Sequence, residues 1–367
     1  MQKHVYTICV LLQILVLIGC DSTDDEFGSR RIDFQLVPID SIGIETGDSC
    51  YVFAKIFDAC FLNPDRIAIS DSRFKKVRIF SRSGDHMYSI SAIGNGPGEC
   101  NYPEDLTRLN NGNLLIGSYY DRKALVFDTS FVFVREILFD NPSSLFKLQP
   151  YGDSSFAGMY LFHNMNSGGN GLARWHDAAE PEYVYIENSA PIDMEYKYQI
   201  TTSLCYTVMS DTMLWVSEYS TDEYTIDCYA PDGSIVQTIS VPYSEHGKSE
   251  DFMRREIEMA RLSYIEATGS DAGFNIDPIR THRATSDLAM DAEGMLWVRQ
   301  GFAEDAPIYD IYDDGGQYMY SCEVAVPCWQ EINKWKIVID EHGYLAIPLN
   351  PEIYPLVYIL EIREIGH

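Results

Sequence analysis

The stretch that decides the fold covers residues 66–128 and reads RIAISDSRFKKVRIFSRSGDHMYSI, SAIGNGPGECNYPEDL and TRLNNGNLLIGSYYDRKALVFD in succession. It begins with two short apolar runs, 66–70 and 77–80, separated by a charged turn. The same order of run, turn and run returns at 114–117 and 124–127, about forty residues later, a period typical of repeat architectures. The stretch therefore predicts small β units arranged in tandem.

Further units of the same kind lie on both sides of this stretch. Strand-forming runs separated by turns define six units, at about 51–90, 106–139, 145–186, 204–241, 287–322 and 335–362. In the third unit we expect a long polar loop around the Asn-Ser-Gly-Gly-Asn-Gly run at 166–171. The sixth unit shows only three clear strands, whereas the alternating run at 32–37 stands apart at the other end of the chain. We predict that this run supplies the missing outer strand and closes a ring, which leaves only short protected edges.

An interruption separates the fourth and fifth units at about 244–283. Within it, apolar residues in 250–265 recur at the spacing of one helical face, so we predict a helix. Ser249 can cap the beginning of this helix and Gly269 can end it. The predicted fold class is all-β. We expect a six-bladed β-propeller over residues 31–367, closed by an N-terminal strand, with a helical insertion between blades four and five.

The composition favours a large β domain with an acidic surface. Hydrophobic residues make up 46% of the 367 residues, and the 25 Tyr and 17 Phe favour strands. Lys and Arg total 27 against 55 Asp and Glu, which gives a net charge of -28. Such a surface repels phosphate backbones and anionic headgroups. We therefore exclude nucleic acid as a partner and expect membrane contact through a lipid anchor only.

The N-terminus has the pattern of an exported, lipid-anchored protein. Lys3 precedes an apolar run at 8–18 that is too short to span a bilayer but suits a signal peptide. The Leu-Ile-Gly-Cys sequence that ends at Cys20 resembles a bacterial lipobox, in which this cysteine becomes the lipidated first residue. The acidic residues that follow resemble the surface-export signal of Bacteroidota lipoproteins. We expect a signal peptide at 1–19, a flexible acidic tether at 20–30, and a lipid-anchored location in the cell envelope, at the outer membrane and either periplasmic or surface-exposed.

The cysteines give no sign of a metal or redox site. Nine cysteines include Cys9 in the signal and the lipidated Cys20, which leaves seven, an odd number that cannot pair completely. None of them forms a C-x-x-C pattern. We predict that most are small buried hydrophobes on strands, and Cys322 with Cys328 is the pair to test for a disulfide.

The sequence Ile-Gly-Asn-Gly-Pro-Gly-Glu at 93–99, with Pro103 four residues further on, resembles a known loop signature. It is the signature of the six-bladed β-propeller lipoproteins of Bacteroides and relatives, which are similar to NHL-repeat propellers. The runs at 76–80 and 124–128 fit the third-strand pattern of that group. The resemblance covers about residues 30–365, and it implies the fold and the envelope location. It implies no catalytic residues.

Several patterns that suggest chemistry have simpler structural explanations. Gly94, Gly96 and Gly98 do not form G-x-G-x-x-G and precede no helix, so we interpret them as a tight inter-blade turn rather than a phosphate cradle. The Gly-Asp-Ser sequence at 152–154 lacks the G-x-S-x-G elbow of a serine nucleophile. Residues 310–315 resemble the start of a calcium loop, but a hairpin turn explains them better. Calcium held in a central channel by several blades stays open, and we predict no other cofactor.

Basic and aromatic residues gather in the loops that we predict on one face of the propeller. Arginine binds carboxylates through paired hydrogen bonds, and aromatic rings offer flat apolar area, so these loops suit a glycan or peptide that carries carboxylates. The predicted ligand-binding residues are Arg73, Lys76, Tyr119, Tyr120, Arg122, Tyr219, His282, Arg283 and Arg299. In or beside the same loops lie Lys75, Lys123, His163, Arg280, Phe302 and Trp329.

Two functions fit these features. The first, which we favour, is an envelope-anchored binding or scaffold propeller that captures a glycan or peptide together with envelope uptake partners. The alternative is a propeller enzyme, a lyase or a lactonase-like hydrolase with a metal in the central channel, which rests on fold analogy alone. Three or more Asp, Glu, Asn or His side chains that converge on a metal in the channel would favour the enzyme. An open cleft lined by basic and aromatic residues would favour binding.

Overall fold

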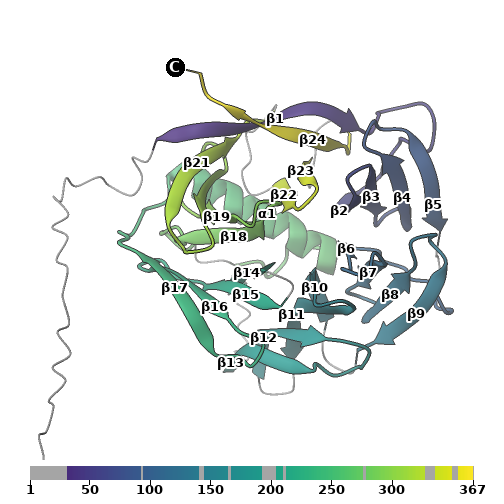
Figure 1. The fold of residues 1–367 in the computed structure, drawn as a ribbon, viewed down its shortest axis with the longest axis horizontal. Coiled ribbons are helices and arrows are strands. Elements are labelled where there is room, and N and C mark those ends of the chain that lie inside the picture. Colours follow the sequence, from purple (N-terminus) through teal and green to yellow (C-terminus); the bar gives the residue numbers. More distant parts are fainter. Residues whose placement is uncertain are drawn as a thin grey trace, which may run out of the picture. The chain divides into compact units, whose positions relative to one another are not determined.

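In the computed structural model, the described residues fold into β-sheets and one α-helix, which confirms the predicted all-β class (Figure 1). The predicted signal peptide and tether, together with Cys20, lie outside the described residues. Within the described part of the chain, no helix has the length and apolar character needed to cross a membrane. The described residues are 31–91, 94–139, 144–163, 167–191, 204–209, 212–275, 278–326, 335–348 and 354–366.

The first sheet contains the beginning of the stretch 66–128, from which the repeat was predicted. Its second and third strands are buried on both faces, which explains their nearly continuous apolar runs. Gly84 adopts a φ of 86° in the predicted Ser-Gly turn, a conformation that glycine enters without steric cost. The strands follow one another in antiparallel order. They are β2 (Ile56–Asn63), β3 (Arg66–Asp71), β4 (Lys76–Ser81) and β5 (His86–Ser91).

Three more four-stranded antiparallel sheets repeat this order. The second contains β6 (Asp105–Arg108), β7 (Leu114–Ser118), β8 (Lys123–Phe127) and β9 (Phe133–Leu138). The third contains β10 (Ser144–Tyr151), β11 (Ser155–His163), β12 (Ser167–Trp175) and β13 (Tyr183–Pro191). The fourth contains β14 (Leu204–Met209), β15 (Met213–Glu218), β16 (Tyr224–Tyr229) and β17 (Ile235–Val241).

The prediction of a polar loop at 166–171 was wrong, because most of this run belongs to β12. Asn170 pairs with Leu161 of β11 on one side and with Asn188 of β13 on the other. Glycine is required where the ring of Tyr160 crosses the strand, since a Cβ on Gly171 would lie 2.5 Å from that ring. Gly171 therefore makes room for a neighbouring aromatic side chain.

The last sheet has eight strands and joins the two ends of the chain. Its first four are β18 (Thr285–Met290), β19 (Leu296–Gln300), β20 (Ile308–Tyr312) and β21 (Tyr318–Val324), and its others are β22 (Trp335–Asp340), β23 (Gly343–Pro348), β24 (Val357–Glu364) and β1 (Ile32–Ile42). The N-terminal strand β1 lies between β24, to which it is antiparallel, and β21, to which it is parallel (Figure 1). Leu36, for example, is paired with Ile362 of β24 and Val324 of β21.

The helix α1 (Glu250–Thr268) lies in the chain between β17 and β18, and the predicted caps form. The side chain of Ser249 accepts a hydrogen bond from the backbone N–H of Phe252. Gly269 ends the helix with a φ of 77° and donates its N–H to the carbonyl of Ile265. The basic residues of α1 are paired with acids of the same segment, as for Arg261 with Glu258 and Asp271.

Apolar side chains fill the spaces between neighbouring sheets. Ile79 of β4 and Leu125 of β8 are fully buried in one cluster between the first and second sheets. Leu36, Trp297 and Leu360 belong to the cluster of the eight-stranded sheet. The described cysteines are free thiols, and all but Cys50 are buried, as predicted for small hydrophobes. Cys322 is among these free thiols, and its proposed partner Cys328 lies outside the described residues.

Candidate functional site

The described residues line a cavity of about 1630 Å³, which we call the central channel. The first strand of each repeat contributes to its wall, so β2, β6, β10, β14, β18 and β22 all face it. We call the end of the channel at which Lys55, Glu104, Tyr119 and Tyr120 lie the entry end.

A belt of polar side chains ties the wall of the channel together. The carboxylate of Asp58 on β2 accepts a hydrogen bond from the N–H of Leu106 on β6 at 2.9 Å. Asp105 on β6 repeats this contact with the N–H of Leu148 on β10 at 3.3 Å. One sheet further on, the side-chain oxygen of Gln149 accepts from the N–H of a β14 residue at 2.8 Å. Each belt residue thus satisfies backbone groups of the next sheet, which is a structural role.

A lysine occupies the acidic part of this belt. The Nζ of Lys336 on β22 lies 2.8 Å from Oδ1 of Asp58, and it connects the last repeat to the first. Burial raises the pKa of Asp105, and the ammonium of Lys336 opposes this shift. Burial lowers the pKa of Lys336, but the carboxylates of Asp58 and Asp105 outweigh it and raise that pKa to about 12. The lysine ammonium therefore supplies the positive charge that these carboxylates need.

Within the described part of the chain, no group of three or more His, Cys, Asp or Glu side chains is placed to hold a metal ion. The predicted calcium-loop resemblance also has another explanation. Asp310 is fully buried, and it accepts hydrogen bonds from Gln300 at 3.0 Å and Ser321 at 2.7 Å. Its carboxylate therefore satisfies polar groups inside the eight-stranded sheet.

Aromatic side chains gather at the entry end. The turn between β7 and β8 carries Tyr119 and Tyr120, whose ring centroids are 5.1 Å apart. Tyr102, from the segment before β6, lies 5.2 Å from Tyr120, and Phe146 of β10 lies 6.4 Å from Tyr119. We call these four residues the aromatic cluster. Tyr120 is 67% exposed, so its ring is available to a ligand.

Charged residues adjoin the aromatic cluster on the channel wall. Lys55 precedes β2, and Lys147 lies in β10 at an irregularity of the strand pairing. Lys147 has a φ of 53°, which is unusual for a residue other than glycine. Such bulges redirect side chains, often beside functional sites. Glu104, just before β6, faces the channel from the same end, and burial raises its pKa to about 7 although Tyr119 N–H and Lys55 favour the ionised form.

The structure brings only part of the predicted site to the channel. Tyr119, Tyr120 and Arg299 line it. Arg73 and Arg122 are exposed and Lys76 is half-buried, but these three are not among the lining residues. Sequence reasoning missed Lys55, Glu104, Phe146 and Lys147, because residues within strands or directly before them show no loop signal. Trp329 lies outside the described residues.

The remaining predicted residues lie at the end of the helical insertion or in contact with it. The guanidinium of Arg283 lies 5.2 Å from the centroid of the Tyr219 ring. His282 is 2% exposed, and its Nε2 lies 2.8 Å from Oε1 of Glu304. The same carboxylate accepts hydrogen bonds from the backbone and hydroxyl of Ser249, the N-cap of α1. His282 therefore anchors the insertion rather than facing a ligand.

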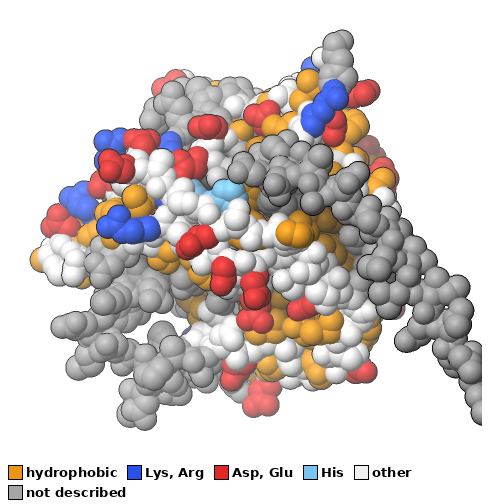
Figure 2. Space-filling view, turned by 90° about the vertical axis from the view of Figure 1, so that its left-hand side faces the viewer, with side chains coloured by type: hydrophobic (Ala, Val, Ile, Leu, Met, Phe, Trp, Pro, Cys, Tyr) orange, Lys and Arg blue, Asp and Glu red, His pale blue; other side chains and the backbone are white. Residues whose placement is uncertain are grey.

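On the side of the molecule seen in Figure 2, the Lys and Arg side chains of the described residues lie beside Asp and Glu side chains and form no separate basic patch. Ion pairs also occur within the insertion, as in Lys248 with Glu256 at 2.6 Å. Opposite charges interspersed in this way leave little net field for an anionic ligand. The cations at the entry end of the channel are therefore the better candidates.

The glycine-rich loop wraps around its own carboxylate. The N–H of Gly96 donates to Oε2 of Glu99 at 3.0 Å. A Cβ on Gly94 would lie 2.1 Å from the same oxygen, and Gly94 and Gly98 have positive φ values of 145° and 77°. These contacts support the interpretation of the glycine-rich loop as a tight turn rather than a phosphate cradle, because the carboxylate of Glu99 occupies the place that a phosphate would take.

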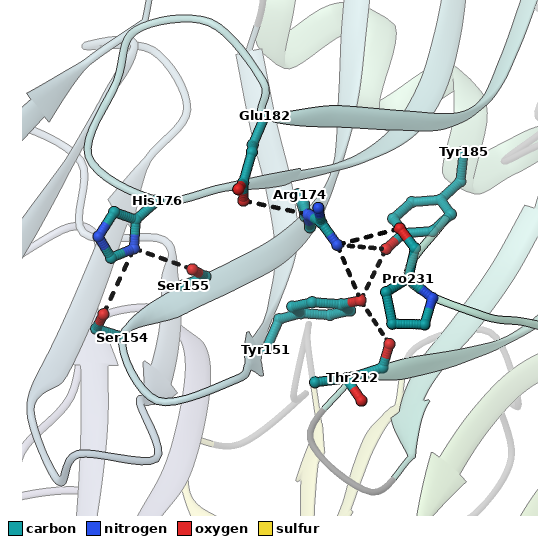
Figure 3. A network of polar contacts seen from close by, with 9 residues as sticks. All are labelled: Tyr151, Ser154, Ser155, Arg174, His176, Glu182, Tyr185, Thr212 and Pro231. Carbon is teal, nitrogen blue, oxygen red and sulfur yellow. Dashed lines mark hydrogen bonds and ion pairs between the residues drawn. The ribbon is translucent and has the colours of Figure 1, made fainter. Parts of the chain in front are cut away.

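Ser155 and His176 lie near a network of tyrosines around Arg174 on the third sheet (Figure 3), and Asp177 follows His176 in the chain. Nδ1 of His176 lies 3.0 Å from Oγ of Ser155, and its Nε2 lies 3.5 Å from Asp177. His176 and Asp177 are each about half exposed, and none of the three lines the channel. A nucleophile needs a site that orients its substrate, so the geometry gives no support to a serine hydrolase.

Comparisons with known proteins agree with the architecture. A crystal structure of a Bacteroides fragilis protein described as exported has a TM-score of 0.50 and 15% identity, and the match covers 94% of this chain and 98% of that one. A member of the DUF4221 family from Bacteroides vulgatus has a TM-score of 0.50 and 11% identity, with coverage of 92% and 100%. At such identities, the likeness concerns the fold alone. A sequence search of curated proteins found no match.

The family itself is identified from the sequence. The model of the DUF5128 family, whose description is 6-bladed beta-propeller, matches residues 30–268, which is well over half of the chain. This match confirms the family resemblance predicted from the loop signature. The chain belongs to this family of six-bladed β-propellers.

Proposed function

We propose that this protein is a binding propeller that captures a glycan or peptide at the entry end of its channel. The observation that carries the proposal is that Tyr119, Phe146 and the exposed Tyr120 line a large channel together with Lys55 and Lys147. Aromatic rings supply flat apolar area at low conformational cost, and the two lysines can attract ligand carboxylates. Among the described residues, no observation favours the alternative, a lyase or lactonase-like hydrolase with a channel metal.

The proposal moves the predicted anionic subsite from arginines to lysines. Arg122 and Arg283 do not line the channel, whereas Lys55, Lys147 and Arg299 do. Acidic ligands are therefore expected to depend on Lys147 more than on Arg122. Replacement of both Lys55 and Lys147 by methionine would weaken acidic ligands and leave neutral ones unaffected.

The test is a binding screen with neutral oligosaccharides, uronate-containing oligosaccharides and acidic peptides. Tyr120→Ala is expected to weaken every ligand found by about tenfold, the equivalent of roughly 1.4 kcal/mol of stacking. Tyr88→Ala is the matched control, because Tyr88 is 47% exposed on β5 and stacks on Phe131 away from the channel. Equal losses in the two variants, or no ligand for the wild type, would refute the proposed site.

We further propose a closed six-bladed ring anchored to the cell envelope. The pairing of β1 with both β24 and β21 supports closure, because it joins the first strand to the last two repeats. The lipobox-like sequence at Cys20 supports a lipid anchor, and the three consecutive acidic residues at 24–26 support export to the surface. Metabolic labelling with a palmitate analogue, compared between wild type and Cys20→Ala, tests the anchor, and protease shaving of intact cells tests surface exposure.

A further inference from the structure

Glu104 has the most unusual environment of the carboxylates at the entry end. Its backbone N–H donates to the carbonyl of Gly117 at 3.0 Å, which fixes the residue beside the end of β7. One carboxylate oxygen receives the backbone N–H of Tyr119. Glu104 is thus held directly against the turn that carries Tyr119 and Tyr120.

The other carboxylate oxygen of Glu104 lacks a partner within the described structure. Oε2 is buried and forms no hydrogen bond with the described residues, and the residue as a whole is only 7% exposed. Buried polar atoms are nearly always hydrogen-bonded, and an exception calls for a missing water, ion or ligand group. Glu104 is among the residues that line the channel, so this unsatisfied carboxylate belongs to the channel wall.

The charges that face Glu104 limit the class of ligand group. Lys55 approaches it from the segment before β2, and Asp121 from the turn after β7. The ammonium of Lys55 already supplies a positive charge, so a second ammonium from a ligand would be repelled. A neutral hydroxyl can donate a hydrogen bond to Oε2 without adding charge.

A sugar ring can satisfy both the aromatic cluster and the unpaired carboxylate oxygen of Glu104. Its apolar face can stack on a tyrosine ring, and the hydroxyls at its edge can reach a neighbouring carboxylate. We propose that Glu104 accepts a hydrogen bond from a hydroxyl of a saccharide ring stacked on the aromatic cluster. This inference rests on the proposed binding function and commits it to saccharides rather than peptides.

The test compares Glu104→Gln, Glu104→Ala and the matched control Glu180→Gln, an exposed carboxylate that does not line the channel. The probes are neutral and uronate-containing tetrasaccharides and tetraglutamate, titrated by calorimetry at pH 8 and pH 6. Melting temperatures establish that each variant is folded. Glu104→Ala is expected to weaken the saccharides by about tenfold, with a smaller loss for Glu104→Gln because a hydroxyl can also accept from the amide.

The two pH values provide a second readout. Burial raises the pKa of Glu104 to about 7, so its ionised fraction falls by about tenfold between pH 8 and pH 6. Wild-type affinity is therefore expected to fall toward that of Glu104→Gln, because the protonated carboxyl keeps one acceptor oxygen. The Glu104→Gln protein is expected to bind equally at both values, and Glu180→Gln to behave as the wild type.

The outcomes separate this inference from the proposed function. If Tyr120→Ala weakens saccharide binding while both Glu104 variants bind as the wild type, the proposed function stands and the role of Glu104 is overturned. If tetraglutamate binds with the same dependence on Glu104, the saccharide class is overturned. If the wild type binds none of the probes, or neither position affects binding, both ideas are wrong.

Discussion

Asp71 provides a sharp test of how the entry end is built. The residue ends β3 and is fully buried. Its carboxylate accepts hydrogen bonds from the backbone N–H groups of Ala54 at 2.9 Å, Lys55 at 3.3 Å and Phe74 at 2.9 Å. It also forms a buried ion pair with Arg78 at 3.3 Å. Asp71 thus fixes the backbone that carries Lys55 to the channel.

The expected cost of Asp71→Ala follows from these four contacts. Removal of one partner of a buried ion pair costs about 3–5 kcal/mol, because the other charge remains without compensation. The side chain of Arg78 is only 4% exposed, so water cannot compensate its charge. Its guanidinium lies over the ring of Phe53, which offsets part of the loss. We expect a loss of about 4 kcal/mol in the free energy of unfolding, a large part of the roughly 5–15 kcal/mol that stabilises a typical domain.

Urea unfolding followed by tryptophan fluorescence measures this loss. Asp85→Ala is the matched control, because Asp85 is exposed in the turn between β4 and β5, and its removal is expected to change stability by less than about 1 kcal/mol. Adding Arg78→Met to Asp71→Ala removes the uncompensated charge and is expected to restore part of the stability. A loss below about 1 kcal/mol for Asp71→Ala, or a double variant less stable than the single one, would refute the reasoning.

Three further predictions concern other parts of the structure. Burial raises the pKa of Glu104 to about 7, above the unfolded value near 4.5, so the contribution of Glu104 to stability declines as pH rises between these values. The melting temperature of Glu104→Gln is therefore expected to fall less from pH 5 to pH 8 than that of the wild type. Parallel profiles of melting temperature against pH for the two proteins would contradict this. Gly94 has a φ of 145°, which alanine adopts only under strain, so denaturation of Gly94→Ala is expected to show a loss of about 1–3 kcal/mol in the free energy of unfolding. An unchanged midpoint would show that the loop adapts. His282→Ala removes the contact with Glu304 at 2.8 Å, and limited proteolysis is expected to cut residues 244–283 faster; an unchanged cleavage rate would argue against the anchoring role.

Local sequence signals were reliable where one segment decides its own conformation. The four strands at 204–241 and the caps of α1 at Ser249 and Gly269 were read from apolar periodicity, turn residues and cap residues. These features depend on neighbours within a few positions along the chain. The prediction for 166–171 was wrong because most of this run belongs to β12, where Gly171 makes room for the ring of Tyr160 on the neighbouring strand.

The candidate site depended on contacts that are distant in sequence. Tyr119 and Tyr120 stood out as loop aromatics, but their neighbours Lys55 and Phe146 come from other sheets. The unpartnered oxygen of Glu104 has no sequence signature at all, since it results from how the turn after β7 folds over the segment before β6. Likewise, His282 appeared as a candidate ligand-binding residue until its burial against Glu304 gave it an anchoring role.

The sequence by itself therefore determined the repeated strands, the family and the acidic character of this protein. Strand period, turn chemistry and composition are local or additive properties that the chain carries before it folds. Only the tertiary structure decided which charges are buried or paired and which polar atoms face the channel. Burial and hydrogen bonding depend on the packing of sheets far apart in sequence, and they select Glu104 and the aromatic cluster from many similar residues.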